Sequence, residues 1–184
     1  RELDLARATG FNTLRVYLHD RTFAEDPAGF LNRMDTFLGL CSARGIKPLF
    51  VFFDDCWLCP TQSPTLIPAP RPGTHNSCWL QSPGSELVRG YPGDAALKQR
   101  LHTYVHTVLS RFAEDPRILA WDLYNEPGNR ATIRFDDKGA EIPGDRRATP
   151  TPEGTKALLE DVFAWAWEVN PAQPLTSGVW SWLR

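Results

Sequence analysis

The sequence predicts an α/β protein built on a parallel sheet, and three observations lead to that prediction. Helical and strand-like patterns alternate four times along the 184 residues. The turns from a helix into the next strand are short, at 10–12, 45–47 and 114–117. Two of the three connections from a strand into the next helix are long, at 54–93 and 128–150. Such alternation favours parallel strands joined by right-handed crossovers.

The four expected strands are short runs rich in β-branched and aromatic residues. They are Thr13 to Leu18, Pro48 to Phe53, Ile118 to Leu123, and Pro174 to Trp180. The second run is almost continuously apolar, which is typical of a strand covered on both faces.

Helices are expected before and between these strands, where apolar side chains recur every three to four residues. The pattern places them at Glu2 to Thr9, Phe30 to Arg44, 94–112 and 152–169. Asp94 and Thr151 have the chemistry of N-caps, and a glycine follows each of the first two helices.

Composition excludes some partners. The formal net charge of −2 and the pI near 6.1 give no reason to expect binding to nucleic acid or to an anionic membrane. We find no apolar run of 18 residues and no signal-like segment, so no membrane span is expected. The chain begins without Met, and we interpret it as part of a longer protein.

The strand that ends in Asn125, Glu126 and Pro127 is the strongest sign of a site. Pro127 cannot continue a paired ladder, so the chain must leave the sheet where the two polar residues are presented. Strict alternation would direct Asn125 and Glu126 to opposite faces, so both can serve one site only if the ladder is irregular there. The two long connections also follow strand ends, where parallel sheets and barrels bind ligands.

The segments around these residues resemble a known family. Thr-Leu-Arg-Val-Tyr at 13–17, Trp-Asp-Leu-Tyr-Asn-Glu-Pro at 121–127, and the stretch at 54–77 are similar to retaining glycoside hydrolases of clan A, of the family 5 type. That family includes cellulases, xylanases and mannanases. The resemblance implies a (β/α)8 TIM barrel, of which residues 1–184 would form about four units, from strand two to strand five, within a single catalytic domain.

The resemblance also implies roles for three residues. Glu126 matches the acid/base glutamate at the end of strand four, Asn125 matches the amide before it, and Arg15 matches the arginine of strand two. A general acid must hold its proton near neutral pH, which burial or a nearby carboxylate can favour. The family's nucleophile is a glutamate that ends strand seven, a strand that this sequence does not reach.

Three further residues are candidate contacts to a sugar. Asp54 ends the second strand, His75 lies in the first long connection, and Trp180 ends the last strand. Each has a plainer alternative. Asp54 could cap the loop through an Asx turn, His75 could bind backbone groups, and Trp180 could belong to the core.

The cysteines leave three possibilities open. Cys56, Cys59, His75 and Cys78 have a spacing compatible with a structural zinc site. Alternatively, Cys59 and Cys78 form a disulfide that closes the long connection, or all the thiols are free. No metal and no cofactor is expected in the reaction itself.

The expected function is therefore hydrolysis of a β-linked polysaccharide, with retention and with an oligo- or polysaccharide as the partner. The resemblance suggests a secreted or periplasmic protein. One rival is a carbohydrate-binding barrel that does not hydrolyse its ligand, or an inactive fragment. Another is an unrelated doubly wound α/β protein, but the sequence has no Gly-x-Gly-x-x-Gly or Walker-type loop, which argues against nucleotide-binding versions.

Overall fold

A four-stranded parallel sheet organises the molecule. The computed structural model describes residues 1–56, 72–73, 80–129, 134–135, 141–142 and 150–179. The sheet consists of β1 (Thr13–Tyr17), β2 (Lys47–Asp54), β3 (Ala120–Asn125) and β6 (Leu175–Gly178), in that order. Each neighbouring pair is parallel. The predicted α/β class is confirmed.

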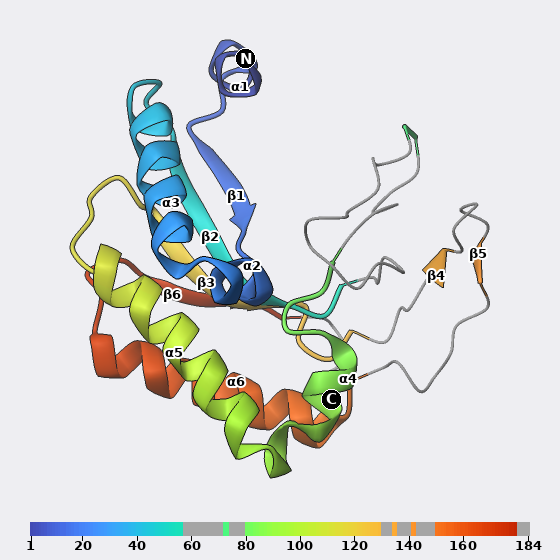
Figure 1. Ribbon diagram of the computed structural model, residues 1–184. Coiled ribbons are helices and arrows are strands. Elements are labelled where there is room, and N and C mark those ends of the chain that lie inside the picture. The colour runs from blue at the N-terminus through green and yellow to red at the C-terminus, as the bar shows by residue number, and fades with distance from the viewer. Residues whose placement is uncertain (57–71, 74–79, 130–133, 136–140, 143–149, 180–184) are drawn as a thin grey trace.

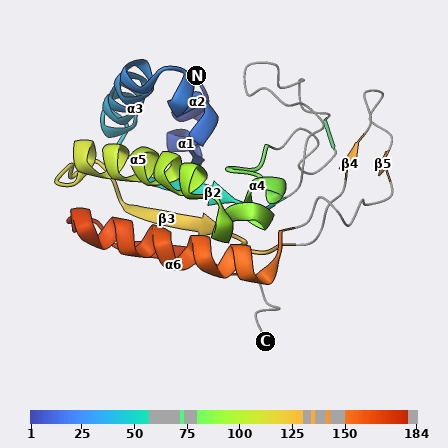
Figure 2. The same cartoon turned by 60° about the horizontal axis from the view of Figure 1, so that its bottom comes forward.

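Three long helices connect successive strands and lie around one side of the sheet (Figure 1). They are α3 (Pro27–Ser42), α5 (Ala95–Phe112) and α6 (Pro152–Val169). Helices α5 and α6 run side by side (Figure 2). This arrangement repeats the strand–helix unit of a (β/α)8 barrel, in which helices cover the outer face of the strands.

Each of these three helices begins at a residue whose side chain caps its first turn. The side chains of Asp26, Asp94 and Thr151 each accept a hydrogen bond from the backbone N–H of the third residue of α3, α5 and α6. The predicted start of α3 at Phe30 was three residues late. Asp26 is the N-cap and Pro27 occupies the first turn, where its missing N–H is not needed.

Several short elements were not expected from the sequence. They are α2 (Asp20–Glu25), α4 (Ser85–Gly90), the 3-10 turn η2 (Tyr91–Gly93), and an antiparallel pair of β4 (Arg134–Phe135) and β5 (Glu141–Ile142). The four in the long connections show that those connections are not structureless. Segments of two to six residues are too short to show a hydrophobic period.

An aromatic layer holds the central strands against the helices. The ring of Trp121 on β3 lies 5.6 Å from that of Phe50 and 5.4 Å from that of Phe52, both on β2. Phe52 in turn meets Tyr104 of α5 at 5.4 Å, and Phe50 meets Phe37 of α3 at 6.3 Å. All except Phe37 are almost fully buried, so this layer fixes how the strand ends are presented.

The outer strands of the described sheet are less buried than the central ones. Every residue of β3 is buried, whereas β1 and β6 contain only exposed and half-buried residues. The first helix, α1 (Glu2–Thr9), buries none of its residues. Among the described helices, none combines the length and the apolar character needed to cross a membrane.

Candidate active site

Polar residues lie in register where the central strands end. Asp54 of β2 pairs with Asn125 of β3, and Asn125 pairs with Gly178 of β6. Asp54 and Asn125 are only 2% and 4% exposed. Because all three strands are parallel, their carboxyl ends meet at the same rim of the sheet, and these residues lie together there.

The side-chain amide of Asn125 is held from both sides. Its Oδ1 accepts a hydrogen bond of 2.9 Å from Nη2 of Arg15, and its Nδ2 donates one of 2.6 Å to Oδ1 of Asp54. The same Asp54 oxygen accepts from the N–H of Cys56 at 3.0 Å. An arginine can only donate and an ionised carboxylate can only accept, so this network assigns the orientation of the amide.

Arg15 has the carboxylate partner that a partly buried guanidinium requires. Nη2 of Arg15 donates to Oδ2 of Asp122, whose side chain is 3% exposed against 40% for Arg15. Burial is the largest single effect and lowers the pKa of Arg15, but the hydrogen bond to Asp122 and the nearby charges, Asp122 first among them, together raise that pKa above its ordinary value. The guanidinium also lies 5.3 Å from the ring centroid of Tyr17, and burial raises the pKa of that phenol to about 12. The site therefore holds a fixed positive charge.

Gly178 leaves room for this cluster. A Cβ at position 178 would lie 2.7 Å from Nη2 of Arg15, 3.0 Å from Oδ1 of Asn125 and 3.4 Å from Oδ2 of Asp122. The backbone N–H of Gly178 donates to Oδ1 of Asp122 at 3.3 Å. The close approach of three polar side chains explains why a residue without a side chain ends β6.

Glu126 leaves the strand in an unusual conformation. Its φ is +45°, in the left-handed region that residues other than glycine rarely adopt. The pairing of β3 with β6 shifts register between Asp122 and Asn125, so the ladder is irregular here, as one site for Asn125 and Glu126 requires. The N–H of Glu126 donates to the carbonyl of Gly178 at 2.7 Å. The backbone of Glu126 is thus anchored to Gly178, the residue that leaves room for Arg15.

The carboxylate of Glu126 is half-buried and has a partner on the following turn. Its Oε2 accepts a hydrogen bond of 2.6 Å from Nδ2 of Asn129. The N–H of Asn129 donates to the carbonyl of Glu126 at 2.9 Å, which closes the turn. Asn129 is 2% exposed, so one oxygen of Glu126 is held by a fixed amide.

A second carboxylate, Asp55, is buried beside this turn and is 1% exposed. Its Oδ2 accepts from the hydroxyl of Tyr124 at 2.7 Å and from the N–H of Gly128 at 2.6 Å. Burial raises the pKa of Asp55 to about 7, although both hydrogen bonds lower it, and the charge of Asp54 raises it further.

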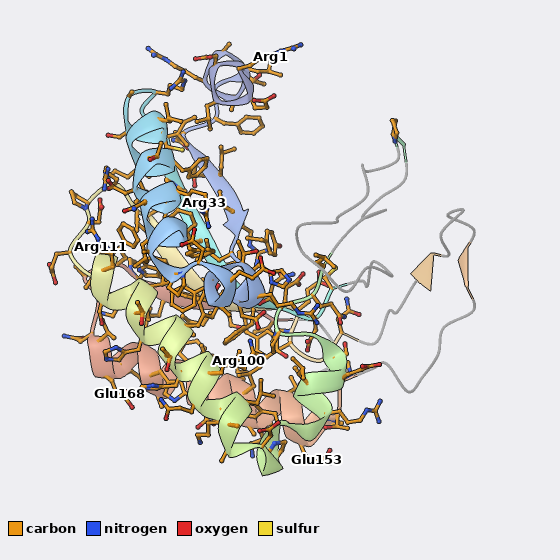
Figure 3. All side chains as sticks on the ribbon, in the orientation of Figure 1. Arg1, Arg33, Arg100, Arg111, Glu153 and Glu168 are labelled. Atoms are coloured by element: carbon orange, nitrogen blue, oxygen red, sulfur yellow. The ribbon has the colours of Figure 1, made fainter. Side chains whose placement is uncertain are left out.

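A polar cluster fixes the end of β2 from the other side. Asp54 exchanges two backbone hydrogen bonds with Ser82, at 2.7 and 3.2 Å. The hydroxyl of Ser82 donates to Oδ1 of Asp20 at 2.8 Å, and Nη1 of Arg100 donates to Oδ2 of Asp20 at 2.6 Å. Arg100 comes from the middle of α5 (Figure 3). Ser82, in the first long connection, is therefore fixed at the rim that carries Asn125.

Four of the six residues selected from the sequence lie at this rim or reach it: Arg15, Asp54, Asn125 and Glu126. The structure shows Asp54 as a hydrogen-bond partner of Asn125, and its direct contact with a sugar stays a prediction. His75 and Trp180 lie outside the described residues.

The zinc and disulfide alternatives stay open. Cys56 is buried at the end of β2, whereas Cys59, His75 and Cys78 lie outside the described residues. Within the described ranges, no group of three or more His, Cys, Asp or Glu side chains is arranged to hold a metal ion.

Sequence reasoning missed Asp122 and the contacts of Asp55. Asp122 could have been found from the sequence, because it is a carboxylate inside an otherwise apolar strand. A buried charge needs a partner, and Arg15 needs a carboxylate. Asp55 directly follows Asp54, the last residue of β2. Its link to Tyr124 and Gly128 depends on how β2 and β3 end, which no local pattern encodes.

The fold is similar to that of solved glycoside hydrolases. An exo-β-1,4-mannosidase from Opitutaceae bacterium strain TAV5 aligns with 97% of this chain at a TM-score of 0.60 and 20% identity. A β-1,4-D-mannanase from Cryptopygus antarcticus aligns with 97% of this chain at a TM-score of 0.56 and 15% identity. The virulence factor SghA, solved with its substrate analogue salicin, aligns with 95% of this chain at a TM-score of 0.56 and 17% identity.

These similarities establish a fold. No protein-family model matches the sequence, and neither does any curated protein. The chain spans 27% of the mannosidase, 48% of the mannanase and 34% of SghA. The four-stranded parallel sheet with its helices is therefore an α/β fold that corresponds to part of a glycoside-hydrolase-type (β/α)8 barrel.

Proposed function

We propose that this chain belongs to a retaining glycoside hydrolase of the family 5 type that cleaves a β-linked polysaccharide such as a glucan, xylan or mannan. The observation that carries the proposal is the position of Glu126. It leaves the carboxyl end of a central strand directly after an amide that Arg15 holds in place. Active sites of (β/α)8 enzymes lie at this end of the strands.

In the proposed reaction Glu126 first acts as an acid. It donates its proton to the glycosidic oxygen while the bond from that oxygen to the anomeric carbon breaks. A second carboxylate attacks the anomeric carbon and forms a covalent glycosyl intermediate. Glu126, now ionised, removes a proton from water as the water displaces that carboxylate. Each of the two displacements inverts the configuration of the anomeric carbon, so the product retains the configuration of the substrate.

The neighbouring polar residues would serve the sugar ring. Asn125 is proposed to bind the 2-hydroxyl, an interaction that strengthens in the transition state. Arg15 would keep the amide in place and supply positive charge. Asp54, His75 and Trp180 remain proposed substrate contacts, and a secreted or periplasmic location agrees with a polysaccharide substrate.

The nucleophile is proposed to be a glutamate at the end of a later strand of the full-length protein. In retaining enzymes the two carboxyl groups are about 5–5.5 Å apart. A barrel allows this, because the ends of its parallel strands converge on one rim.

Replacing the proposed acid tests the function. We expect Glu126→Gln in the full-length protein to lower kcat on unsubstituted β-linked oligosaccharides by about 100-fold or more, because general acid–base catalysis contributes about 10²–10⁴-fold. The fold should survive, since the amide keeps the size of the acid. Turnover would be followed by reducing-sugar release from gluco-, xylo- and manno-oligosaccharides.

Glu153→Gln is the matched control, because Glu153 is an exposed glutamate in the first turn of α6. It should leave activity unchanged. Full activity of Glu126→Gln would reject the assignment. A wild-type protein that binds these oligosaccharides and never cleaves them would instead support a carbohydrate-binding barrel.

A further inference from the structure

We propose that Asp55 is a positioning residue for Glu126: it holds the strand end before the glutamate and the turn after it, and so aims the acid at the glycosidic oxygen. This inference rests on the proposed function of Glu126. Asp55 does not itself touch the reacting atoms in this account.

The contacts of Asp55 lie on both sides of Glu126 in the chain. Its Oδ2 accepts from the hydroxyl of Tyr124, two residues before the glutamate, at 2.7 Å. The same oxygen accepts from the N–H of Gly128, two residues after it, at 2.6 Å. The N–H of Asp55 also donates to the carbonyl of Asn125 at 3.3 Å. One side chain and its own backbone thus span the whole segment from 124 to 128.

That segment needs an external constraint. Glu126 has φ of +45° and Gly128 has φ of +77°. A left-handed glutamate costs conformational free energy, which the surrounding structure must offset. The two hydrogen bonds that Oδ2 of Asp55 accepts fix Tyr124 and Gly128, the residues that flank the strained position.

Asp55 itself is held firmly. Its carbonyl accepts from Nε2 of Gln81 at 2.8 Å, and Oε1 of Gln81 accepts from the N–H and the hydroxyl of Ser85 at 3.0 and 2.8 Å. All three residues are at most 3% exposed. Burial raises the pKa of Tyr124 well above its usual range, so its hydroxyl keeps the proton that it donates.

Loss of a positioning residue and loss of a purely structural residue should differ in how strongly the rate loss depends on the leaving group of the substrate. Expulsion of 2,4-dinitrophenolate needs little protonation, whereas expulsion of a sugar or an unsubstituted phenol needs the acid. Misplacing Glu126 should therefore slow the poor leaving groups selectively. A general loss of folded protein would slow both kinds of substrate by the same factor.

The test is Asp55→Ala in the full-length protein, with kcat/KM measured on a phenyl and a 2,4-dinitrophenyl β-glycoside of the sugar that the wild type cleaves. We expect kcat/KM to fall at least about tenfold more for the phenyl glycoside. Asp55→Asn, which still presents one acceptor oxygen to both donors, should keep nearly the wild-type ratio. Equal losses on both glycosides with Asp55→Ala would overturn the proposal.

Two further variants keep the result interpretable. Asp161→Ala is the matched control, because it removes a carboxylate that accepts from Tyr91 Oη at 2.7 Å, away from Glu126. It should leave the ratio unchanged. If Asp55→Ala fails to fold, Tyr124→Phe decides, because it removes the hydrogen bond from the Tyr124 hydroxyl to Asp55 and should produce a smaller shift in the same direction. An unchanged ratio would reject the proposal.

Glu126→Ala separates this proposal from the proposed function. If Glu126 is the acid, Glu126→Ala must show the same selective loss in larger measure. Selective loss in Glu126→Ala without any in Asp55→Ala rejects the positioning role alone. An unselective loss in Glu126→Ala rejects the acid role, and the inference about Asp55 falls with it.

Discussion

Buried charges decide the chemistry of this rim. Asp122 is 2% exposed in a strand that is otherwise largely apolar, and an unpaired charge there would cost several kcal/mol. Arg15 and the N–H of Gly178 both donate to it. The arginine can then hold Asn125 with its remaining donors, so a structural ion pair also orients a proposed substrate-binding amide.

Gly178→Ala tests this cluster at the level of one methyl group. The added Cβ would lie 2.7 Å from Nη2 of Arg15, and the flexible end of the arginine must move. Losing a hydrogen bond of a charged group costs about 1.5–3 kcal/mol, so kcat/KM should fall by about tenfold or more. Steady-state kinetics and thermal unfolding of the full-length variant measure this.

Gly39→Ala provides the comparison, because a Cβ there meets nothing within 4 Å and the residue lies inside α3. It should leave kcat/KM unchanged and stabilise the helix by about 0.5–1 kcal/mol. A Gly178→Ala enzyme with wild-type kinetics would mean that the Arg15 cluster does not serve the substrate.

At the scale of elements, Asp55 joins the end of β2 to the turn that follows β3, and its titration should make this junction sensitive to pH. Its pKa is about 7 in the folded protein, against an ordinary value of 3.8. Between those values the folded state binds one more proton than the unfolded state. Stability therefore falls as pH rises from about 4 to about 7, by about 1.4 kcal/mol per pH unit at most.

Asp55→Asn should remove this contribution, because an amide does not titrate in this range. Relative to the wild type, the variant should become more stable as pH is raised from 5 to 8. Urea unfolding of the full-length proteins at both pH values measures the difference. An identical pH dependence in the two proteins would show that Asp55 is already ionised at pH 5 in the folded state.

The long elements could be predicted from the sequence, and the short ones could not. Strands β1, β2, β3 and β6 and the long helices follow from apolar periodicity and from caps such as Asp94 and Thr151. Elements α2 and α4 pack against longer helices, which leaves little local signature, and β4 and β5 are only two residues each. Likewise, Glu126 could be selected from its place before Pro127, but its φ of +45° depends on Asp55 and Gly178.

At the scale of the molecule, the chain presents part of a barrel. Four parallel strands with three long helices on one side match larger glycoside hydrolases over about a quarter to a half of their length. The edge strands β1 and β6 are the least buried of the sheet. In a closed barrel both edges would pair with further strands, and the carboxyl ends of those strands would complete the rim that carries Glu126.

A crystal structure of the full-length protein with an uncleaved β-linked oligosaccharide would show directly whether Glu126 is the acid. We expect a carboxylate oxygen of Glu126 within about 3.2 Å of the glycosidic oxygen. A second carboxylate should lie about 5–5.5 Å from the carboxylate of Glu126, on the other side of the anomeric carbon. A glycan bound with its scissile bond away from Glu126, or a rim that holds no second carboxylate, would contradict a retaining mechanism with Glu126 as the acid.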